Sequence, residues 1–183
     1  MRLILVRHWQ TENNLKWLST WQLDIGLTDL WIQQAQEAGK KLLEENISTI
    51  DKIYSSTLQR ALKTAEIIKS IIWANGWDIN TSDLMQERDL GLQTNQPRQN
   101  RVNISSLPKD EKEKAMQDLG VESNENIDKR IKEFITSISD KGYDNVLLVW
   151  HRWRFRRLLI NVLNIEVSED DLKNWSITII NII

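Results

Sequence analysis

Residues 3–10 read LILVRHWQ and residues 146–153 read VLLVWHRW. Each stretch is a short apolar run that ends in a histidine, His8 in the first and His151 in the second, and the chain has 2 histidines in all. A short apolar run of this kind predicts a buried strand. Ligands of open α/β sheets bind beyond the carboxyl ends of the strands. If the two strands are neighbours, both imidazoles are therefore expected in one crevice.

The rest of the chain alternates between helical and strand-like patterns. Apolar residues recur at helical spacing over residues 28–43, 55–68, 123–139 and 154–164. Short apolar runs at residues 2–6, 53–54, 146–149 and 176–183 are typical of strands. This alternation predicts an α/β fold, a three-layer α/β/α sandwich with a mostly parallel central sheet.

Two helix starts carry capping signals. Thr28 can cap the first helix, whose inner face is predicted to hold Ile32, Ala35, Gly39, Leu42 and Leu43. Ser56 and Gln59 match a capping box, which would place Arg60 in the first turns of the second helix.

Residues 80 to about 123 interrupt the alternation. They hold both prolines, the charged run KDEKEK and many polar residues. A long segment of this kind inside a domain is often functional, and we interpret it as an irregular insertion that carries a short helix and serves as a lid. The 183 residues suit a single domain, 1–183, with a full-sized core.

Composition excludes several classes of protein. Lys and Arg total 24 and Asp and Glu total 26, so the net charge of −2 gives no reason to expect nucleic acid or an anionic membrane as partner. The absence of cysteine excludes a disulfide scaffold, a thiolate metal site and a cysteine nucleophile. The apolar start is too short for a signal peptide and no run approaches membrane-spanning length, so the cytoplasm is expected. The basic stretch RWRFRR at 152–157 is interpreted as solvated arginines around Phe155, with Arg152 nearest the pocket.

Arg7, His8, Arg60 and His151 all lie beside predicted strand ends or helix starts. Backbone N–H groups at a helix N-terminus favour anions, and arginine binds phosphate oxygens in bidentate fashion. A neutral imidazole is a competent nucleophile toward phosphorus. Two guanidiniums and two imidazoles near a helix start therefore indicate a phosphate pocket.

Five segments of the chain resemble, in their order, the motifs of the histidine phosphatase superfamily, which includes cofactor-dependent phosphoglycerate mutase. The segments that carry the resemblance are RHWQTENN, STWQLDIGLTDLW, SSTLQRALKTAEII, LMQERDLG and LLVWHRW. They run in family order from residue 2 to about residue 157, and WSITIINI fits the family's last strand. Any one motif is weak evidence, but the ordered set is specific.

The resemblance implies a catalytic role for three residues. His8 would attack the phosphorus of a monoester and become phosphohistidine. Glu87 would protonate the leaving alcohol and then activate the water that hydrolyses the intermediate. His151 would hold the phosphoryl oxygens and stabilise charge in the transition state.

The resemblance also implies binding roles. Arg7, Asn14 and Arg60 would bind the phosphate, and Thr20 would contact the substrate. Because arginines hold the phosphate, neither a metal nor a cofactor is expected.

The implied activity is hydrolysis of a small phosphorylated metabolite through a phosphohistidine intermediate. The short chain leaves little room for the insertions of a mutase, so hydrolase is favoured over cofactor-dependent phosphoglycerate mutase. A third interpretation is a non-catalytic protein that binds a phosphate ligand, with Trp9 and Trp150 filling the pocket. The identity of the metabolite stays open, as does the oligomeric state, for which a homodimer is one option.

The chain departs from the family in one respect: tryptophan stands where the family has glycine. The positions concerned are Trp9, Trp17, Trp21, Trp31, Trp150, Trp153 and Trp175, with Trp73 and Trp77 in a loop that also suits glycine. Only 6 of 183 residues are glycine, roughly 3% against a usual value of about 7%. A tryptophan forced into a glycine position costs roughly 1–2 kcal/mol in backbone strain, and typically about 1–3 kcal/mol more in packing.

This pattern is typical of a gene in which UGA encodes glycine, read with a code in which UGA encodes tryptophan. The alternative hypothesis is that the tryptophans are genuine and remodel the site. The masses of native peptides that span His8 and His151 distinguish the two.

Overall fold

The computed structural model describes residues 1–7, 16, 18, 22–23, 28–45, 47, 49–72, 78–166 and 177–182. Within these segments the chain forms a 5-stranded sheet with the strand order β3-β2-β4-β1-β5. The strands are β1 (Arg2–Arg7), β2 (Lys52–Ser56), β3 (Ile79–Ser82), β4 (Asn145–Trp150) and β5 (Ile177–Asn181). β5 pairs antiparallel with β1, whereas the other pairings are parallel.

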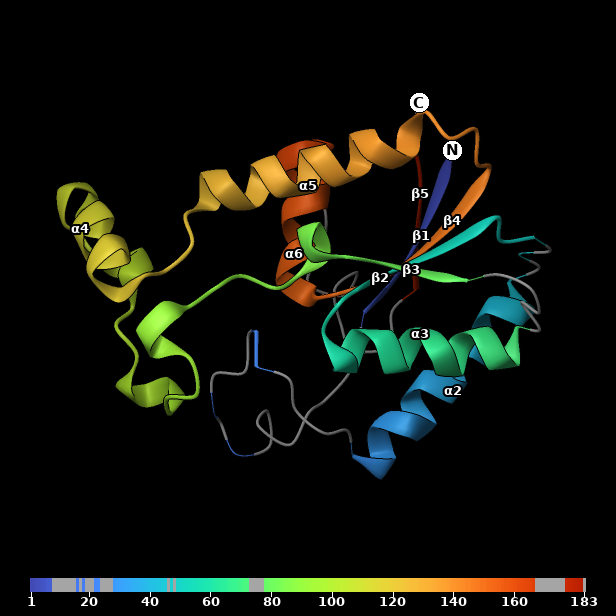
Figure 1. Ribbon diagram of the computed structural model, residues 1–183, viewed down its shortest axis with the longest axis horizontal. Coiled ribbons are helices and arrows are strands. Elements are labelled where there is room, and N and C mark those ends of the chain that lie inside the picture. Colours follow the sequence, from blue (N-terminus) through green and yellow to red (C-terminus); the bar gives the residue numbers. More distant parts are fainter. Residues whose placement is uncertain are drawn as a thin grey trace.

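Helices cover both faces of this sheet (Figure 1). One face carries α2 (Asp29–Glu44) and α3 (Gln59–Ile71), and the other carries α5 (Asn124–Ser139) and α6 (Arg152–Arg157). α4 (Lys109–Leu119) lies away from the sheet, beyond the N-terminal end of α5 (Figure 1). The three-layer α/β/α sandwich with a mostly parallel sheet is confirmed.

The two central strands explain why the sheet is buried on both faces. In β1, Leu3 and Leu5 point to the α5 side, while Ile4 and Val6 point to the α2 side. β4 alternates in the same way and is buried along its whole length. Successive side chains of a strand point to opposite faces, so a continuous apolar run serves two cores at once.

β1 and β4 are neighbours, so the condition under which the sequence places both histidines in one crevice is met. Their parallel register pairs Val6 with Val149 and Arg7 with Trp150. His151 therefore follows β4 at the same edge of the sheet where β1 ends in Arg7.

The inner face of α2 differs from the prediction in part. Thr28 caps the helix, because its hydroxyl accepts from the Trp31 N–H at 3.3 Å. Ile32 and Leu43, which were predicted to face inward, are 39% and 48% exposed. The buried stripe runs instead through Trp31, Ala35, Ala38, Gly39 and Leu42. The inner stripe is thus centred on position 31, and positions 32 and 43 fall at its border.

The capping box predicted at α3 is wrong. The N-cap of α3 is Leu58, which has no side-chain cap, and the Ser56 hydroxyl accepts from the Leu58 N–H at 3.3 Å. Ser56 is the last residue of β2, so it supports the turn before the helix rather than the helix itself. Arg60 still falls in the first turn.

The α5 layer agrees with the sequence more closely. Ser123 caps α5, and the apolar stripe predicted for this helix is buried. The helix predicted for residues 154–164 is divided into α6 and a π-helical turn over Leu158–Val162. Arg154, predicted to be solvated, is completely buried. The physical reason is that Arg154 donates to main-chain carbonyls, as described below.

Residues 80–123 begin with β3, a strand that the sequence did not predict. After β3 come the 3-10 turns η1 (Asp83–Met85), η2 (Gly91–Gln93), η3 (Arg98–Asn100) and η4 (Ile104–Ser106), and then α4. Their role as a lid stays a prediction. Among the described residues, no helix is both long and apolar enough to span a membrane.

Candidate active site

The structure places part of the predicted site. Arg7, Arg60, Glu87 and His151 are described, whereas His8, Asn14 and Thr20 lie outside the described residues. The roles of the latter three stay predictions.

Arg7 and His151 lie at the carboxyl ends of β1 and β4. His151 is completely buried. Burial and, to a lesser extent, the charge of Arg152 lower the pKa of the Arg7 guanidinium to about 10, while the charge of Glu87 opposes this shift. A guanidinium with this pKa stays charged at neutral pH. This edge of the sheet therefore holds one partly buried cation near one buried imidazole, a combination suited to binding an anion.

Arg60 reaches the same region from the other layer. It is the second residue of α3 and only 1% exposed. Its Nη1 donates to the carbonyl oxygen of Leu23 at 2.8 Å. The Thr64 hydroxyl donates to the Arg60 carbonyl at 2.7 Å and stiffens this first turn. The N–H groups at the start of α3 add positive potential around the guanidinium.

Glu87 is 7% exposed and lies within electrostatic range of Arg7 and Arg60. Burial raises the pKa of its carboxyl to about 7, although the Arg88 N–H and the charges of Arg60, Arg7 and Arg130 oppose the rise. The Arg88 N–H donates to Glu87 Oε1 at 2.9 Å. The electrostatic effect of Arg7 and Arg60 on this carboxyl shows that the structure brings these predicted residues together.

A carboxyl group with a pKa near 7 can exchange a proton in both directions at neutral pH. The protonated form can donate to a leaving oxygen, and the carboxylate can accept from water. Glu87 is thus suited to act first as an acid and then as a base.

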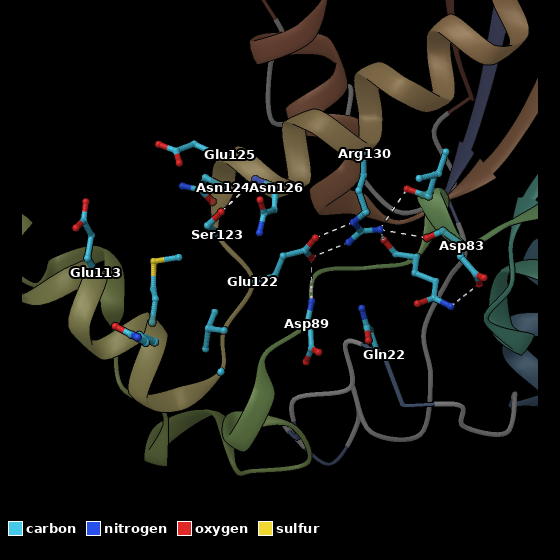
Figure 2. Close-up of a pocket in the computed structure, with 16 residues that line it drawn as sticks. Gln22, Asp83, Asp89, Glu113, Glu122, Ser123, Asn124, Glu125, Asn126 and Arg130 are labelled. Atoms are coloured by element: carbon cyan, nitrogen blue, oxygen red, sulfur yellow. Dashed lines mark hydrogen bonds and ion pairs between the residues drawn. The ribbon is translucent and has the colours of Figure 1, made fainter.

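The sequence did not predict several residues that surround Glu87. Gln22 donates to the Glu87 carbonyl at 2.9 Å. Figure 2 shows Arg130 of α5 pointing at the main chain just before Glu87, with Glu122 against its other side. Arg154 also donates to this main chain. No motif quoted from the sequence includes Glu122 or Arg130, and only their placement in the fold reveals them.

Two cavities border the segment that follows Glu87. One, of about 880 Å³, lies between α4 and the start of α5 and is lined by Asp89, Glu113 and Glu125 among others (Figure 2). The other, of about 420 Å³, is lined by residues 88–105, with Val121 and Trp153. Residues of the predicted insertion line both.

Trp150 lies in the core on the α5 side and not in a ligand pocket, which corrects the interpretation from the sequence, whereas Trp9 lies outside the described residues. The Trp150 side chain is completely buried. Its indole N–H donates to the Met85 carbonyl, and its ring packs edge-on against Phe134 and Phe155. The alternation of β4 turns position 150 to this core, away from the α2 face.

The family model of the histidine phosphatase superfamily (branch 1) matches residues 3–183. A 2,3-bisphosphoglycerate-dependent phosphoglycerate mutase of Allorhizobium ampelinum is 40% identical over 89 residues, which cover 49% of this chain and 42% of the relative. The corresponding mutase of Bartonella henselae is 38% identical over 109 residues, covering 60% of this chain and 47% of the relative. The matches thus span less than half of each of these curated relatives.

Solved structures share the fold over nearly the whole chain. A putative alpha-ribazole-5'-P phosphatase from Escherichia coli superposes with a TM-score of 0.78 and 22% identity, covering 100% of this chain and 91% of that one. A phosphoglycerate mutase from Bacillus anthracis gives a TM-score of 0.81 and 20% identity, covering 98% and 86%.

Proposed function

Because the chain belongs to branch 1 of the histidine phosphatase superfamily, we propose that it hydrolyses phosphomonoesters through a phosphohistidine intermediate. The observation that carries this proposal is Glu87: a buried carboxyl whose pKa is raised to about 7 and whose charge interacts with Arg7 and Arg60. An acid-base group of this pKa near two guanidinium groups is suited to the transfer of a phosphoryl group from an alcohol.

In the first proposed step, His8 attacks phosphorus. The bond between its ring nitrogen and phosphorus forms while the bond from phosphorus to the ester oxygen breaks, and Glu87 gives its proton to the departing alkoxide. Arg7, Arg60 and His151 hold the oxygens of the phosphoryl group, on which charge is spread in the transition state.

In the second step, Glu87 accepts a proton from water as the water oxygen attacks the phosphohistidine. The nitrogen–phosphorus bond breaks, inorganic phosphate forms and His8 is restored. Asn14 contacts the phosphate and Thr20 the substrate in this scheme. The Glu87 carboxyl gives up a proton in the first step and accepts one in the second, so this scheme uses neither a metal nor a cofactor.

The proposed substrate is a small phosphorylated metabolite. Its part beyond the phosphate would meet residues 80–123, because most of the residues that line the two cavities flanking the chain around Glu87 belong to that segment. The cytoplasmic location, the absence of nucleic-acid and membrane partners and the oligomeric state stay predictions.

A mutase is the second candidate, and the identity to curated mutases favours it. We rank hydrolysis first because the matched segments cover only 42% of the mutase of Allorhizobium and 47% of that of Bartonella. The two activities differ in a simple way: a mutase depends on bisphosphoglycerate and releases little free phosphate.

The test measures phosphate release from p-nitrophenyl phosphate, without bisphosphoglycerate, and traps acid-labile phosphate on His8. It uses two versions of the chain, one as printed and one with glycine at all nine tryptophan positions. Activity in either version that His8→Ala abolishes supports the proposal. Activity only with bisphosphoglycerate and phosphoglycerate favours the mutase. Two folded but inactive versions that still bind phosphate overturn the proposal in favour of a binding protein.

A further inference from the structure

Two arginines hold the main chain directly before Glu87. Nη1 of Arg130 donates to the carbonyl oxygens of Asp83, Leu84 and Gln86, each at 3.2 Å (Figure 2). Nε of Arg154 donates to the same Gln86 carbonyl at 2.6 Å. Each carbonyl is an acceptor with two lone pairs, so one oxygen can bind both guanidiniums. The residue next to Glu87 is therefore fixed from α5 and from α6.

Glu122 fixes Arg130 in turn. Its carboxylate accepts from Arg130 Nε at 2.7 Å and from Nη2 at 2.6 Å, the paired geometry that makes such bonds strong. The Glu122 side chain also accepts from the Asp89 N–H at 3.2 Å, and the main-chain carbonyl of Glu122 accepts from Arg88 Nε at 2.9 Å. Glu122 thus binds the chain after Glu87, while its partner Arg130 binds the chain before it.

The main chain is therefore held by hydrogen bonds both before and after Glu87. A general acid must lie within hydrogen-bond reach of the oxygen that it protonates, and a displacement of about 1 Å can cost 10²-fold in rate. The described hydrogen bonds of Glu122 and Arg130 reach Glu87 through the segment 83–89, and the charge of Arg130 acts on the Glu87 carboxyl as well.

We propose that Glu122 and Arg130 are positioning residues for Glu87, an inference that rests on the proposed function. Neither residue touches the phosphate in this proposal. Each acts by holding the carboxyl of Glu87 where the leaving oxygen will be.

The charges around Glu87 decide which substitutions can move its carboxyl without also changing its pKa. Arg7 of β1, Arg60 of α3 and Arg130 of α5 all lower the pKa of Glu87, and the Arg88 N–H does the same by hydrogen bonding. Removing the charge at 130 would therefore change both the pKa and the position of the acid. Arg130→Lys keeps the charge and removes the fork of donors, and Glu122→Gln keeps an acceptor and removes the ion pair.

The experiment measures kcat/KM with a series of substituted phenyl phosphates, from p-nitrophenyl phosphate to unsubstituted phenyl phosphate. kcat/KM reports the step that cleaves the ester. A good leaving group such as nitrophenolate departs with little protonation, whereas phenolate depends more on the acid. We expect Arg130→Lys and Glu122→Gln to lower kcat/KM by roughly 10- to 100-fold on phenyl phosphate, and by only about 3-fold on p-nitrophenyl phosphate.

The matched control is Arg157→Lys. Arg157 makes a similar paired ion bridge from α6 to Asp128 of α5 but has no bond to residues 83–89 among the described interactions. It should change neither rate. The ratio of the two rates is independent of the fraction of folded enzyme, so partial unfolding of a variant cannot produce the expected result.

Glu87→Gln separates this proposal from the proposed function. The quantity compared is the dependence of kcat/KM on the leaving group. If this dependence steepens in Glu87→Gln and equally in Arg130→Lys and Glu122→Gln, the positioning role is supported. If Glu87→Gln steepens it while Arg130→Lys and Glu122→Gln lower all rates alike, the positioning role is wrong and the acid role of Glu87 stands. If Glu87→Gln leaves the dependence unchanged, the acid role fails and the positioning role fails with it.

Discussion

Among the described residues, each face of the sheet buries one tryptophan, and the two faces accommodate it differently. Trp150 on the α5 side and Trp31 on the α2 side are both completely buried. Trp150 finds the Met85 carbonyl for its indole N–H and two aromatic neighbours for its ring. The indole N–H of Trp31 is buried without an acceptor in the described part of the structure. One face is shaped for an indole, and the other encloses an indole without pairing its polar atom.

The side chains around Trp31 explain the difference. The inner face of α2 continues with Ala35, Ala38 and Gly39. At Gly39 an added Cβ would lie 2.9 Å from the Cβ of Ile71 in α3, so the two helices approach closely. In this closely packed layer of small residues, the described residues offer the Trp31 indole N–H no acceptor. An unpaired buried donor costs about 1–3 kcal/mol, whereas each aromatic pair on the other face contributes about 0.5–1.5 kcal/mol.

This comparison bears on the hypothesis that glycine is native at these positions. The hypothesis treats the tryptophans alike, but the structure separates them: Trp31 carries an unpaired donor and Trp150 does not. Substitutions at the two positions can therefore break or sharpen the comparison.

The largest effect is expected for Trp150→Gly in the chain as printed. Removing a buried aromatic side chain leaves a cavity and typically costs about 3–5 kcal/mol, and glycine in a strand interior weakens it further. Urea denaturation followed by circular dichroism measures the loss. A neutral or stabilising result would contradict the packing of Trp150 described above and favour glycine as the native residue.

The next effect concerns Glu87. Arginines from both faces of the sheet, Arg60 in α3 and Arg130 in α5, lower the pKa of its carboxyl and so oppose the effect of burial. Its pKa in the folded protein is raised from 4.5 to about 7. A raised carboxyl pKa means that the folded state resists ionisation, so stability is lost as pH rises from about 4.5 through 7. The loss should reach roughly 3 kcal/mol at pH 8, since one pKa unit corresponds to about 1.4 kcal/mol.

Glu87→Gln removes the titration and keeps the neutral shape. The free energy of unfolding of the variant minus that of the parent chain should therefore be small at pH 4.5 and increase to roughly 3 kcal/mol by pH 8. Other titrating groups cancel in this difference. A difference that stays constant with pH would show that burial does not raise the pKa of Glu87, and the assignment of Glu87 as the acid would lose its main support.

Much of the fold was predictable from the sequence, because its central strands are apolar without interruption. Runs such as LILV and VLLV cannot be left exposed, so they indicated buried strands, although their pairing with each other stayed open. β3 was missed because its residues, INTS, are mostly polar and lie on a partly exposed strand that pairs only with β2. Its position depends on the edge of β2, which no local pattern encodes.

The candidate site was predictable only where local position determines it. Arg7 and His151 follow from strand ends, and Arg60 follows from a helix start. Arg154 was placed in solvent because a basic run has no local signal for burial. It is buried because Gln86, far away in the sequence, offers a carbonyl acceptor. Glu122 and Arg130 were missed for the same reason, since main-chain acceptors leave no trace in the residue types.

The smallest effect, and the sharpest for the comparison, comes from phenylalanine at both tryptophans. Trp150→Phe leaves the Met85 carbonyl without its donor, whereas Trp31→Phe removes a donor that has no acceptor. Both substitutions delete the same atoms, so the loss of ring volume largely cancels between them. Trp31→Phe should therefore cost less than Trp150→Phe by about 1–3 kcal/mol, the value of one unsatisfied buried group. Matched urea titrations measure this difference, and equal costs would mean that the two faces treat an indole N–H alike, which the geometry around Met85 argues against.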